Sequence, residues 1–165
     1  MIVISDTNII SSFAAAESLP LLLDALHVDH LLIPSAVYDE LQAGISAKVA
    51  YLKPISSWID SKILRVVSLS AEQLGRAETL PQSFGACERQ GIILTDDLHG
   101  TLLTNEKRVV NYCARNHLLC LNLSQLLRLL WKEKVATPDQ VRTFMRRMTE
   151  AEGITFKDDD QLFTS

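Results

Sequence analysis

Several features that mark membrane and secreted proteins are absent from this sequence. No stretch approaches the roughly 20 consecutive apolar residues that a membrane-spanning helix needs. The first ten residues, MIVISDTNII, carry no basic cluster and therefore do not resemble a signal peptide. The three cysteines cannot all pair, and none lies in a CxxC or other close metal-ligand spacing. We therefore expect reduced, buried thiols in a cytoplasmic protein that does not contact a membrane.

A net positive charge is also absent. The 16 Lys and Arg residues face 20 Asp and Glu residues, which gives a formal net charge of −4 and disfavours nucleic-acid binding through bulk positive charge. With 22% charged and 47% hydrophobic residues, the composition excludes disorder, a collagen-like repeat and a coiled coil for the whole chain. The 165 residues predict one domain, 1–165, with a C-terminal helical segment at about 138–152 and an acidic tail at 153–165.

Short apolar runs alternate with amphipathic stretches along the chain. Most of these runs lack polar alternation, which is typical of strands buried on both faces. The runs lie at 2–4, 31–33, 64–67, 92–94 and 118–121. Strands separated by helices predict an α/β fold, in which a central, mainly parallel five-stranded sheet lies between two helical layers.

Helix boundaries are indicated at several points between the runs. Ser35 precedes a helical pattern that Gly44 is expected to end. Ser70 begins a Ser-Ala-Glu-Gln sequence that resembles a capping box, and Thr137 precedes Pro138 in a second helix start. Pro54 is expected to divide the 46–61 stretch into two helices.

Carboxylates follow two of the predicted strands. Asp6 comes directly after the first strand, and Asp96 and Asp97 come after the strand predicted at 92–94. Because the carboxyl ends of parallel strands meet at one edge of the sheet, these acids are expected at the same edge. Asp6 alone has a second interpretation, as the N-cap of the helix that starts near Thr7.

Glu40 is a third candidate acid. It lies three residues after Val37 in the predicted helix and so borders the expected buried stripe, although it could also be an ordinary boundary residue in solvent. Clustered carboxylates repel, and the repulsion is relieved either by a shared proton or by a cation. Oxygen ligands without clustered His or Cys favour Mg²⁺ or Mn²⁺, which suits phosphodiester hydrolysis. Thr7 and Asn8 could orient a carboxylate, a water or a phosphate.

Three segments together resemble the PIN-domain family of VapC-like, metal-dependent ribonucleases. Residues 3–8, Val-Ile-Ser-Asp-Thr-Asn, are similar to the first motif of that family, and residues 33–41 are similar to the second, in which Glu40 is the metal-site acid. Residues 94–97, Leu-Thr-Asp-Asp, resemble the strand-end Thr-x-Asp motif. The resemblance implies a PIN-like three-layer fold and a metal site made by Asp6, Glu40 and Asp97. Asp96 is a neighbour that assists, and Thr95 is a supporting residue.

The sequence departs from the family at one place. The family has another acid at the start of the helix that precedes the Thr-x-Asp strand, where its pattern reads Ser-x-Gly-acid. Here residues 83–86 read Ser-Phe-Gly-Ala, so Ala86 stands where that acid is expected. Glu88 or Glu78 could substitute from a different angle, and Glu88 is therefore included among the candidate metal ligands.

The resemblance implies an endoribonuclease that hydrolyses RNA with Mg²⁺ or Mn²⁺. Many small members are toxins of toxin–antitoxin pairs, and PIN-like proteins often form homodimers, so RNA, an antitoxin and a second copy are the implied partners. The alternative is a catalytically degenerate PIN-like module that binds RNA or protein. A phosphatase of the haloacid-dehalogenase type ranks third, because its second Asp is replaced here by Asn8.

Positive charge is concentrated in one part of the chain, residues 105–150. These positions either form solvated helix faces or provide a rim that contacts phosphate around an acidic site. Lys107 and Arg108 are the first basic residues after the acidic candidates and are the candidate RNA-binding residues.

Overall fold

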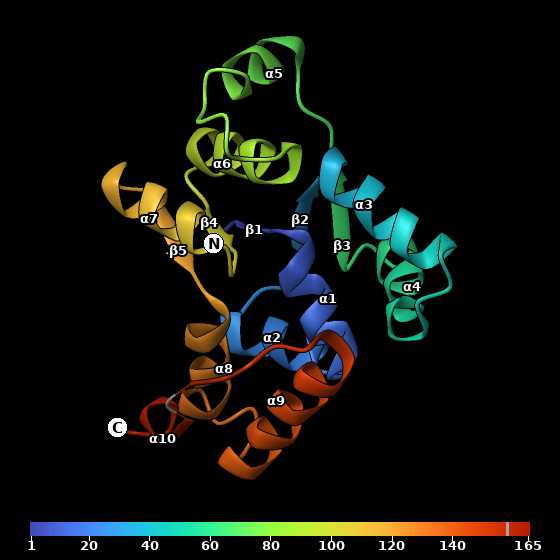
Figure 1. The fold of residues 1–165 in the computed structure, drawn as a ribbon, viewed down its shortest axis with the longest axis vertical. Coiled ribbons are helices and arrows are strands. Elements are labelled where there is room, and N and C mark those ends of the chain that lie inside the picture. The colour runs from blue at the N-terminus through green and yellow to red at the C-terminus, as the bar shows by residue number, and fades with distance from the viewer. Residues whose placement is uncertain (158) are drawn as a thin grey trace.

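A parallel five-stranded sheet organises the chain. In the computed structural model, which describes residues 1–157 and 159–165, the strands are β1 (Val3–Ser5), β2 (Leu31–Pro34), β3 (Leu64–Val67), β4 (Thr101–Leu103) and β5 (Leu119–Leu121). Their order is β3-β2-β1-β4-β5, with every neighbouring pair parallel (Figure 1). The predicted α/β class with a parallel central sheet is confirmed.

Helices connect the strands and cover the sheet. In chain order they are α1 (Thr7–Ala15), α2 (Leu19–Leu26), α3 (Ser35–Ser46), the 3₁₀ turn η1 (Ala50–Leu52), α4 (Pro54–Asp60), α5 (Ala71–Ala77), α6 (Ala86–Leu98), α7 (Lys107–Arg115), α8 (Leu123–Lys132), α9 (Pro138–Glu152) and α10 (Asp159–Leu162). Within the described residues no single helix could span a membrane, although α1 and α2, which meet at 119°, satisfy the length and hydropathy criteria as a bent pair.

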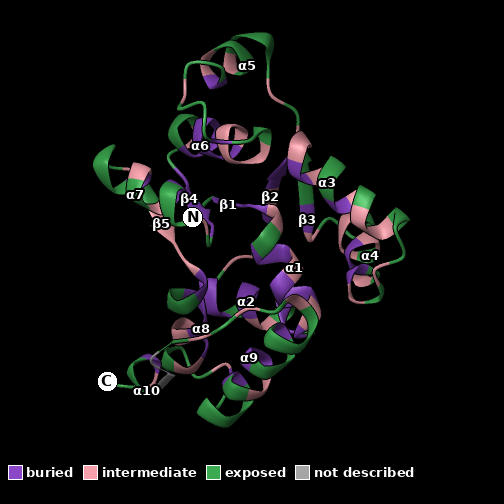
Figure 2. Cartoon of the chain, in the orientation of Figure 1, coloured by how far each residue is buried: buried purple, intermediate pink, exposed green. Residues whose placement is uncertain are grey.

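Two hydrophobic cores lie on the two faces of the sheet. Neighbouring strand residues alternate between them: Val3 belongs to the core beneath α1, α2, α8 and α9, and Ile4 belongs to the core beneath α6 and α7. Leu103 and Leu102 alternate in the same way on β4. The central strands are buried in Figure 2, and the helical layers above and below them appear in Figure 1. This arrangement is the predicted three-layer α/β/α architecture.

One predicted strand is wrong. Residues 92–94 lie inside α6, and the fourth strand is instead Thr101–Leu103. A short apolar run has the same hydrophobicity in a buried strand and on the buried face of a helix, so the pattern alone could not separate the two. His99 ends α6 in the left-handed conformation, with φ 51°. A Cβ on the following Gly100 would lie 2.6 Å from a methyl group of Ile4, so glycine permits this close turn into β4.

The predicted helix starts are mostly correct. Capping boxes form at Ser70 and Thr137, and α4 begins at Pro54. Gly44 does not end α3, which continues to Ser46; a Cβ at position 44 would lie 2.6 Å from a methyl group of Leu52, so a larger residue would require that side chain to shift. Helix α9 covers residues 138–152. The expected acidic tail includes Asp158, which lies outside the described residues.

Candidate functional site at the carboxyl edge of the sheet

Asp6 occupies the junction between β1 and α1. Its Oδ1 accepts a 2.9 Å hydrogen bond from the backbone N–H of Ile9, which makes Asp6 the N-cap of α1. Its Oδ2 accepts a 2.6 Å hydrogen bond from the hydroxyl of Thr104, the residue directly after β4. Its backbone N–H also donates to the carbonyl of Leu103, at 3.0 Å. The two interpretations of Asp6 are therefore compatible, since the same carboxylate caps a helix and lies at the sheet edge.

Burial changes the acidity of Asp6. The residue is 8% exposed, and this loss of hydration raises its pKa from 3.8 to about 6. The hydrogen bonds from Thr104 and Ile9 stabilise the charged form and oppose the rise, whereas the negative charge of Glu88 adds to it. A buried carboxylate that still faces a second acid is an unfavourable arrangement that a bound cation would relieve.

Glu40 reaches the same edge from α3. Its side chain is exposed, and its Oε2 accepts a 2.9 Å hydrogen bond from the thiol of Cys87 in the first turn of α6. The hydroxyl of Thr7 donates to the same sulfur at 3.8 Å. Partial burial and the nearby Glu40 raise the pKa of Cys87 to about 12, so the thiol is a neutral donor. Cys87 thereby connects the amino-terminal turns of α1 and α6 to the middle of α3.

Glu88 lies next to this contact, also in the first turn of α6. Its charge acts on both Asp6 and Cys87. Ala86, where the family acid is expected, is the exposed first residue of the same helix. Three of the proposed metal-site acids, Asp6, Glu40 and Glu88, are therefore brought to one region.

Asp97 and Asp96 are not brought there. Both lie in the last turn of α6, and ten residues of helix separate Asp97 from Cys87, which corresponds to about 15 Å along the helix axis. The carboxylate of Asp97 accepts hydrogen bonds from Arg76, at 2.8 and 3.0 Å, and from Gln73, at 2.8 Å. These α5 partners lower the pKa of Asp97. The expectation that Asp97 follows a strand and joins Asp6 is therefore wrong.

The remaining supporting residues also differ from expectation. Thr95 is buried inside α6, where its hydroxyl donates 2.7 Å to the carbonyl of Gly91. It therefore satisfies a helix carbonyl rather than orienting a ligand. Asp96 lies 3.6 Å from Arg76 and belongs to the same surface group as Asp97. Asn8, by contrast, lies exposed beside Asp6 at the start of α1, as expected.

The residues that do follow β4 are Thr104, Asn105 and Glu106, which the sequence interpretation missed. They repeat the Thr-x-acid spacing of the family motif, and that spacing after the run Thr-Leu-Leu was the signal that could have identified them. Glu106 is half-buried and accepts a 3.3 Å hydrogen bond from Arg108. Lys107 and Arg108 begin α7 and are exposed next to this acid.

A polar pocket of about 210 Å³ opens between the starts of α1 and α7 and the end of α9. It is lined by Asn8, Ser12, Asn105, Glu106, Glu152 and Ile154. Glu152, the last residue of α9, accepts hydrogen bonds from the hydroxyls of Ser11 and Ser12, the latter at 2.6 Å. The C-terminal helix therefore forms one wall of the candidate site and is fixed to α1.

The side chains at this edge suit a hard divalent cation in their chemistry, because Asp6, Glu40, Glu88 and Glu106 offer only oxygen ligands. Among the residues that the structure describes, however, no group of three His, Cys, Asp or Glu side chains converges closely enough to hold a metal ion. The donors Thr104, Ile9 and Cys87 engage the oxygens of Asp6 and Glu40 instead. The residues thus fit Mg²⁺ or Mn²⁺ by ligand type, and binding would require the exposed Glu40 and the half-buried Glu88 side chains to turn towards Asp6.

Comparison with known proteins identifies the family. A family model described as PIN domain matches residues 2–159. Neither the curated proteins nor the solved structures give a match. The family match covers the whole sheet and α9, in agreement with the parallel three-layer fold. It also covers the carboxyl edge of the sheet with Asp6, Glu40, Glu88 and Glu106, here called the acidic edge. The chain therefore belongs to the PIN-domain family.

Proposed function

We propose that this protein is an endoribonuclease that hydrolyses RNA phosphodiester bonds with Mg²⁺ or Mn²⁺. The observation that carries the proposal is the buried carboxylate of Asp6 at the carboxyl edge of a parallel sheet, joined to Thr104 and close to a second acid. Burial of this carboxylate beside Glu88 is costly without a cation, and such a cost is typical of functional sites.

Four acids are proposed to hold the metal: Asp6, Glu40, Glu88 and Glu106. Thr104 fixes the carboxylate of Asp6 through its 2.6 Å hydrogen bond, which leaves less rotational freedom for that ligand. When bound, the ion would polarise a phosphoryl oxygen and lower the pKa of a water molecule. Asn8 and Asn105 offer amide groups in the adjoining pocket for the sugar or a phosphate, and Lys107 and Arg108 offer positive charge.

A narrower form of the proposal is a cytoplasmic toxin that an antitoxin inhibits, as the VapC-like resemblance implies. An antitoxin could act by covering the exposed Glu40. Expression in a bacterial host tests this form: growth arrest that Asp6→Asn relieves supports a toxin, and unaffected growth with an RNA-cleaving protein contradicts it.

A catalytically degenerate binding module is the second candidate. Two observations favour it: Ala86 replaces the family acid, and the Cys87 thiol occupies an oxygen of Glu40. A protein of this kind would keep the fold and bind RNA without cleaving it.

One set of assays separates the two candidates. Mixed single-stranded RNA is incubated with the protein in Mg²⁺, in Mn²⁺ and in EDTA, alongside the Asp6→Asn and Glu40→Gln variants. The matched control is Asp97→Asn, which makes the same Asp-to-Asn change at the far end of α6, away from the site. Metal-dependent cleavage that Asp6→Asn abolishes and Asp97→Asn retains supports the nuclease. RNA binding without cleavage in either metal supports the binding module, and cleavage that persists in Asp6→Asn reveals a contaminant.

A further inference from the structure

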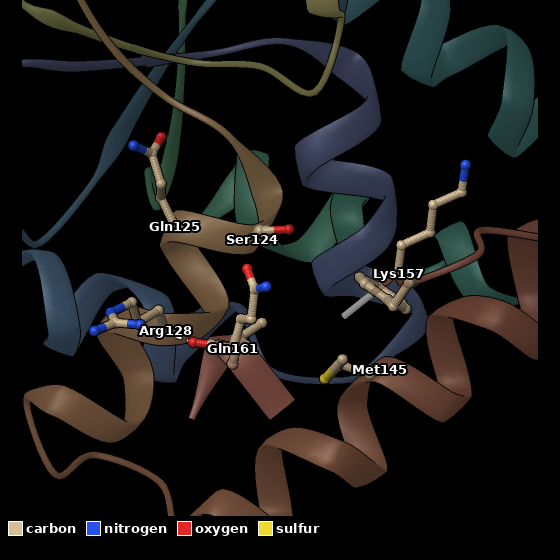
Figure 3. Close-up of a pocket in the computed structure, with 8 residues that line it drawn as sticks. Ser124, Gln125, Arg128, Met145, Lys157 and Gln161 are labelled. Carbon is tan, nitrogen blue, oxygen red and sulfur yellow. Dashed lines mark hydrogen bonds between the residues drawn. The ribbon is translucent and has the colours of Figure 1, made fainter. Parts of the chain in front are cut away.

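Two adjoining pockets lie on the C-terminal side of the molecule, outside the acidic edge. The first, of about 260 Å³, lies between α8, α9 and the C-terminal segment (Figure 3). The second, of about 340 Å³, lies over α9. Met145 and Phe156 line both pockets, so the two form a single groove, here called the C-terminal groove.

Among the side chains that the structure describes, the charged ones that line this groove are all cations: Arg128, Arg142, Arg146 and Lys157. Arg128 and Lys157 lie on opposite sides of the first pocket in Figure 3. Arg142 pairs with Asp139 at 3.2 Å, and Arg128 donates to the carbonyl of Gln161 at 3.0 Å. Arg146 and Lys157 are exposed, and neither makes an ion pair with another described residue. The protein as a whole is acidic, so this concentration of positive charge is local.

The groove is adjacent to the candidate catalytic site. Consecutive residues of the segment 154–157 line first the polar pocket beside Asp6, through Ile154, and then the groove, through Thr155, Phe156 and Lys157. Helix α9 makes the same connection, because Thr149 lines the groove and Glu152, one turn later, lines the polar pocket. A chain bound at the acidic edge could therefore continue into the groove.

Three kinds of side chain in the groove match the three parts of a nucleotide. The cations suit phosphates, and the half-buried Phe156 ring offers a surface for base stacking. The amide of Gln161 and the side-chain N–H groups of Gln125, whose oxygen caps α8, offer hydrogen bonds. An acidic peptide could use the cations and the amides, but acidic side chains offer no flat group to stack on the ring of Phe156.

We propose that the C-terminal groove binds single-stranded RNA that extends from the acidic edge. This inference rests on the proposed function in taking RNA as the ligand, and it holds whether the acidic edge cleaves that RNA or only binds it. The residues proposed to contribute the binding energy are the exposed cations Arg146 and Lys157 and the aromatic Phe156.

Binding is measured by fluorescence anisotropy with a labelled 12-nucleotide single-stranded RNA, in EDTA, from 50 to 300 mM KCl. The double variant Arg146→Ala/Lys157→Ala is expected to bind about tenfold more weakly at 100 mM salt and to reduce the salt slope by about 1.4, the value for two lost phosphate contacts on a single strand. Phe156→Leu keeps an apolar side chain in place and is expected to weaken binding about fivefold without changing the slope.

The matched control is Lys53→Ala/Arg65→Ala, which removes two exposed cations, one directly after η1 and one in β3, neither of which lines the groove. Circular dichroism melts confirm that each variant is folded. Equal loss of affinity in the control, or an unchanged slope in the groove variant, would overturn the proposal. Displacement of RNA by polyglutamate at equal charge concentration would assign the groove to acidic proteins instead. Cleavage is assayed separately, so that failure of the nuclease proposal with a positive binding result leaves the groove intact.

Discussion

The hydroxyl of Thr104 donates to the carboxylate of Asp6 across 98 positions of sequence, at 2.6 Å. Both residues are buried, and each directly follows a strand of the same parallel pair, β1 and β4. This hydrogen bond therefore fixes the most buried acid of the candidate site to the neighbouring strand end. Its energetic consequences can be measured in the protein without a metal or a substrate.

Replacing Thr104 with Val removes the hydroxyl and keeps the shape of the side chain. A hydrogen bond to a charged carboxylate contributes about 1.5–3 kcal/mol, so Thr104→Val should lower the free energy of unfolding by about that amount above pH 6. The pKa of Asp6 should rise further, because the hydrogen bond stabilises its charged form. Urea denaturation at pH 7.5 measures the loss. Thr104→Ser retains the donor and should recover most of the stability, and an equal loss in both variants would contradict the explanation.

The free energy of unfolding should depend on pH because folding raises the pKa of Asp6. Its pKa is about 6 in the folded protein and near 3.8 in the unfolded chain, so folding favours the protonated form. The stabilisation from this group is fully present below pH 4 and is lost as the pH rises to about 6, by about 3 kcal/mol in total. Denaturation in EDTA between pH 4 and 8 should show the fall, and Asp6→Asn should flatten it. The control Asp24→Asn, at an exposed position of α2, should leave the curve unchanged.

Metal binding should distinguish Glu106 from Asp97. A cation that binds only the folded state raises the melting temperature by linkage, so millimolar Mn²⁺ should stabilise the wild type. Glu106→Gln should reduce this rise, whereas Asp97→Asn should retain it, because Asp97 is paired with Arg76 and lies on the other end of α6. Loss of the Asp97–Arg76 ion pair should itself cost less than about 1 kcal/mol, as for other exposed pairs. The reverse order of effects would restore Asp97 to the site.

The contact between Glu152 and the two serines of α1 should contribute measurably to stability. Its carboxylate accepts two hydroxyl hydrogen bonds, and Ser12 is buried. Glu152→Ala should therefore lower the free energy of unfolding by about 1–3 kcal/mol, because two donors lose their partner. A double-mutant cycle with Ser12→Ala should give a coupling energy of at least about 0.5 kcal/mol. Glu150 lies two residues earlier and is exposed, so Glu150→Ala should change the free energy of unfolding little and serves as the control.

Restoring the family acid at position 86 should strengthen metal binding. Ala86 is the exposed first residue of α6, so Glu fits there and its charge is favourable at a helix N-terminus. Ala86→Glu should increase the Mn²⁺-induced rise in melting temperature, and Ala86→Gln should not. If both variants behave like the wild type, position 86 does not face the metal.

The sequence was sufficient to predict the architecture and the positions of two acids. Asp6 follows a strand whose three residues are all buried. The Asp-Thr-Asn sequence of residues 6–8 marked the end of that strand and therefore the edge of the sheet. Glu40 was placed correctly on its helix, because Val37 and Leu41 define a buried stripe that the structure reproduces. Helical and strand periodicity are local properties, and for this reason they could be read without the rest of the chain.

The acid after β4 could not be identified in the same way, because two segments satisfy one pattern. Thr95-Asp96-Asp97 and Thr104-Asn105-Glu106 both follow a short apolar run. The choice between them depends on which run pairs with β1, and the pairing of Ile4 with Leu102 is a long-range contact that no local pattern records. The groove of Arg146 and Lys157 was equally hidden, since its pockets form only after the C-terminal segment folds back over α9.

The position of β1 in the middle of the sheet has a consequence for synthesis on the ribosome. This strand is made before the other four strands of the sheet, yet its second neighbour, β4, begins only at residue 101. One edge of β1 must therefore stay unpaired until residues 6–100 have been translated, and an unpaired apolar strand is prone to pair with other chains. A nascent chain stalled before residue 101 should consequently depend on chaperones more strongly than one that already includes β4.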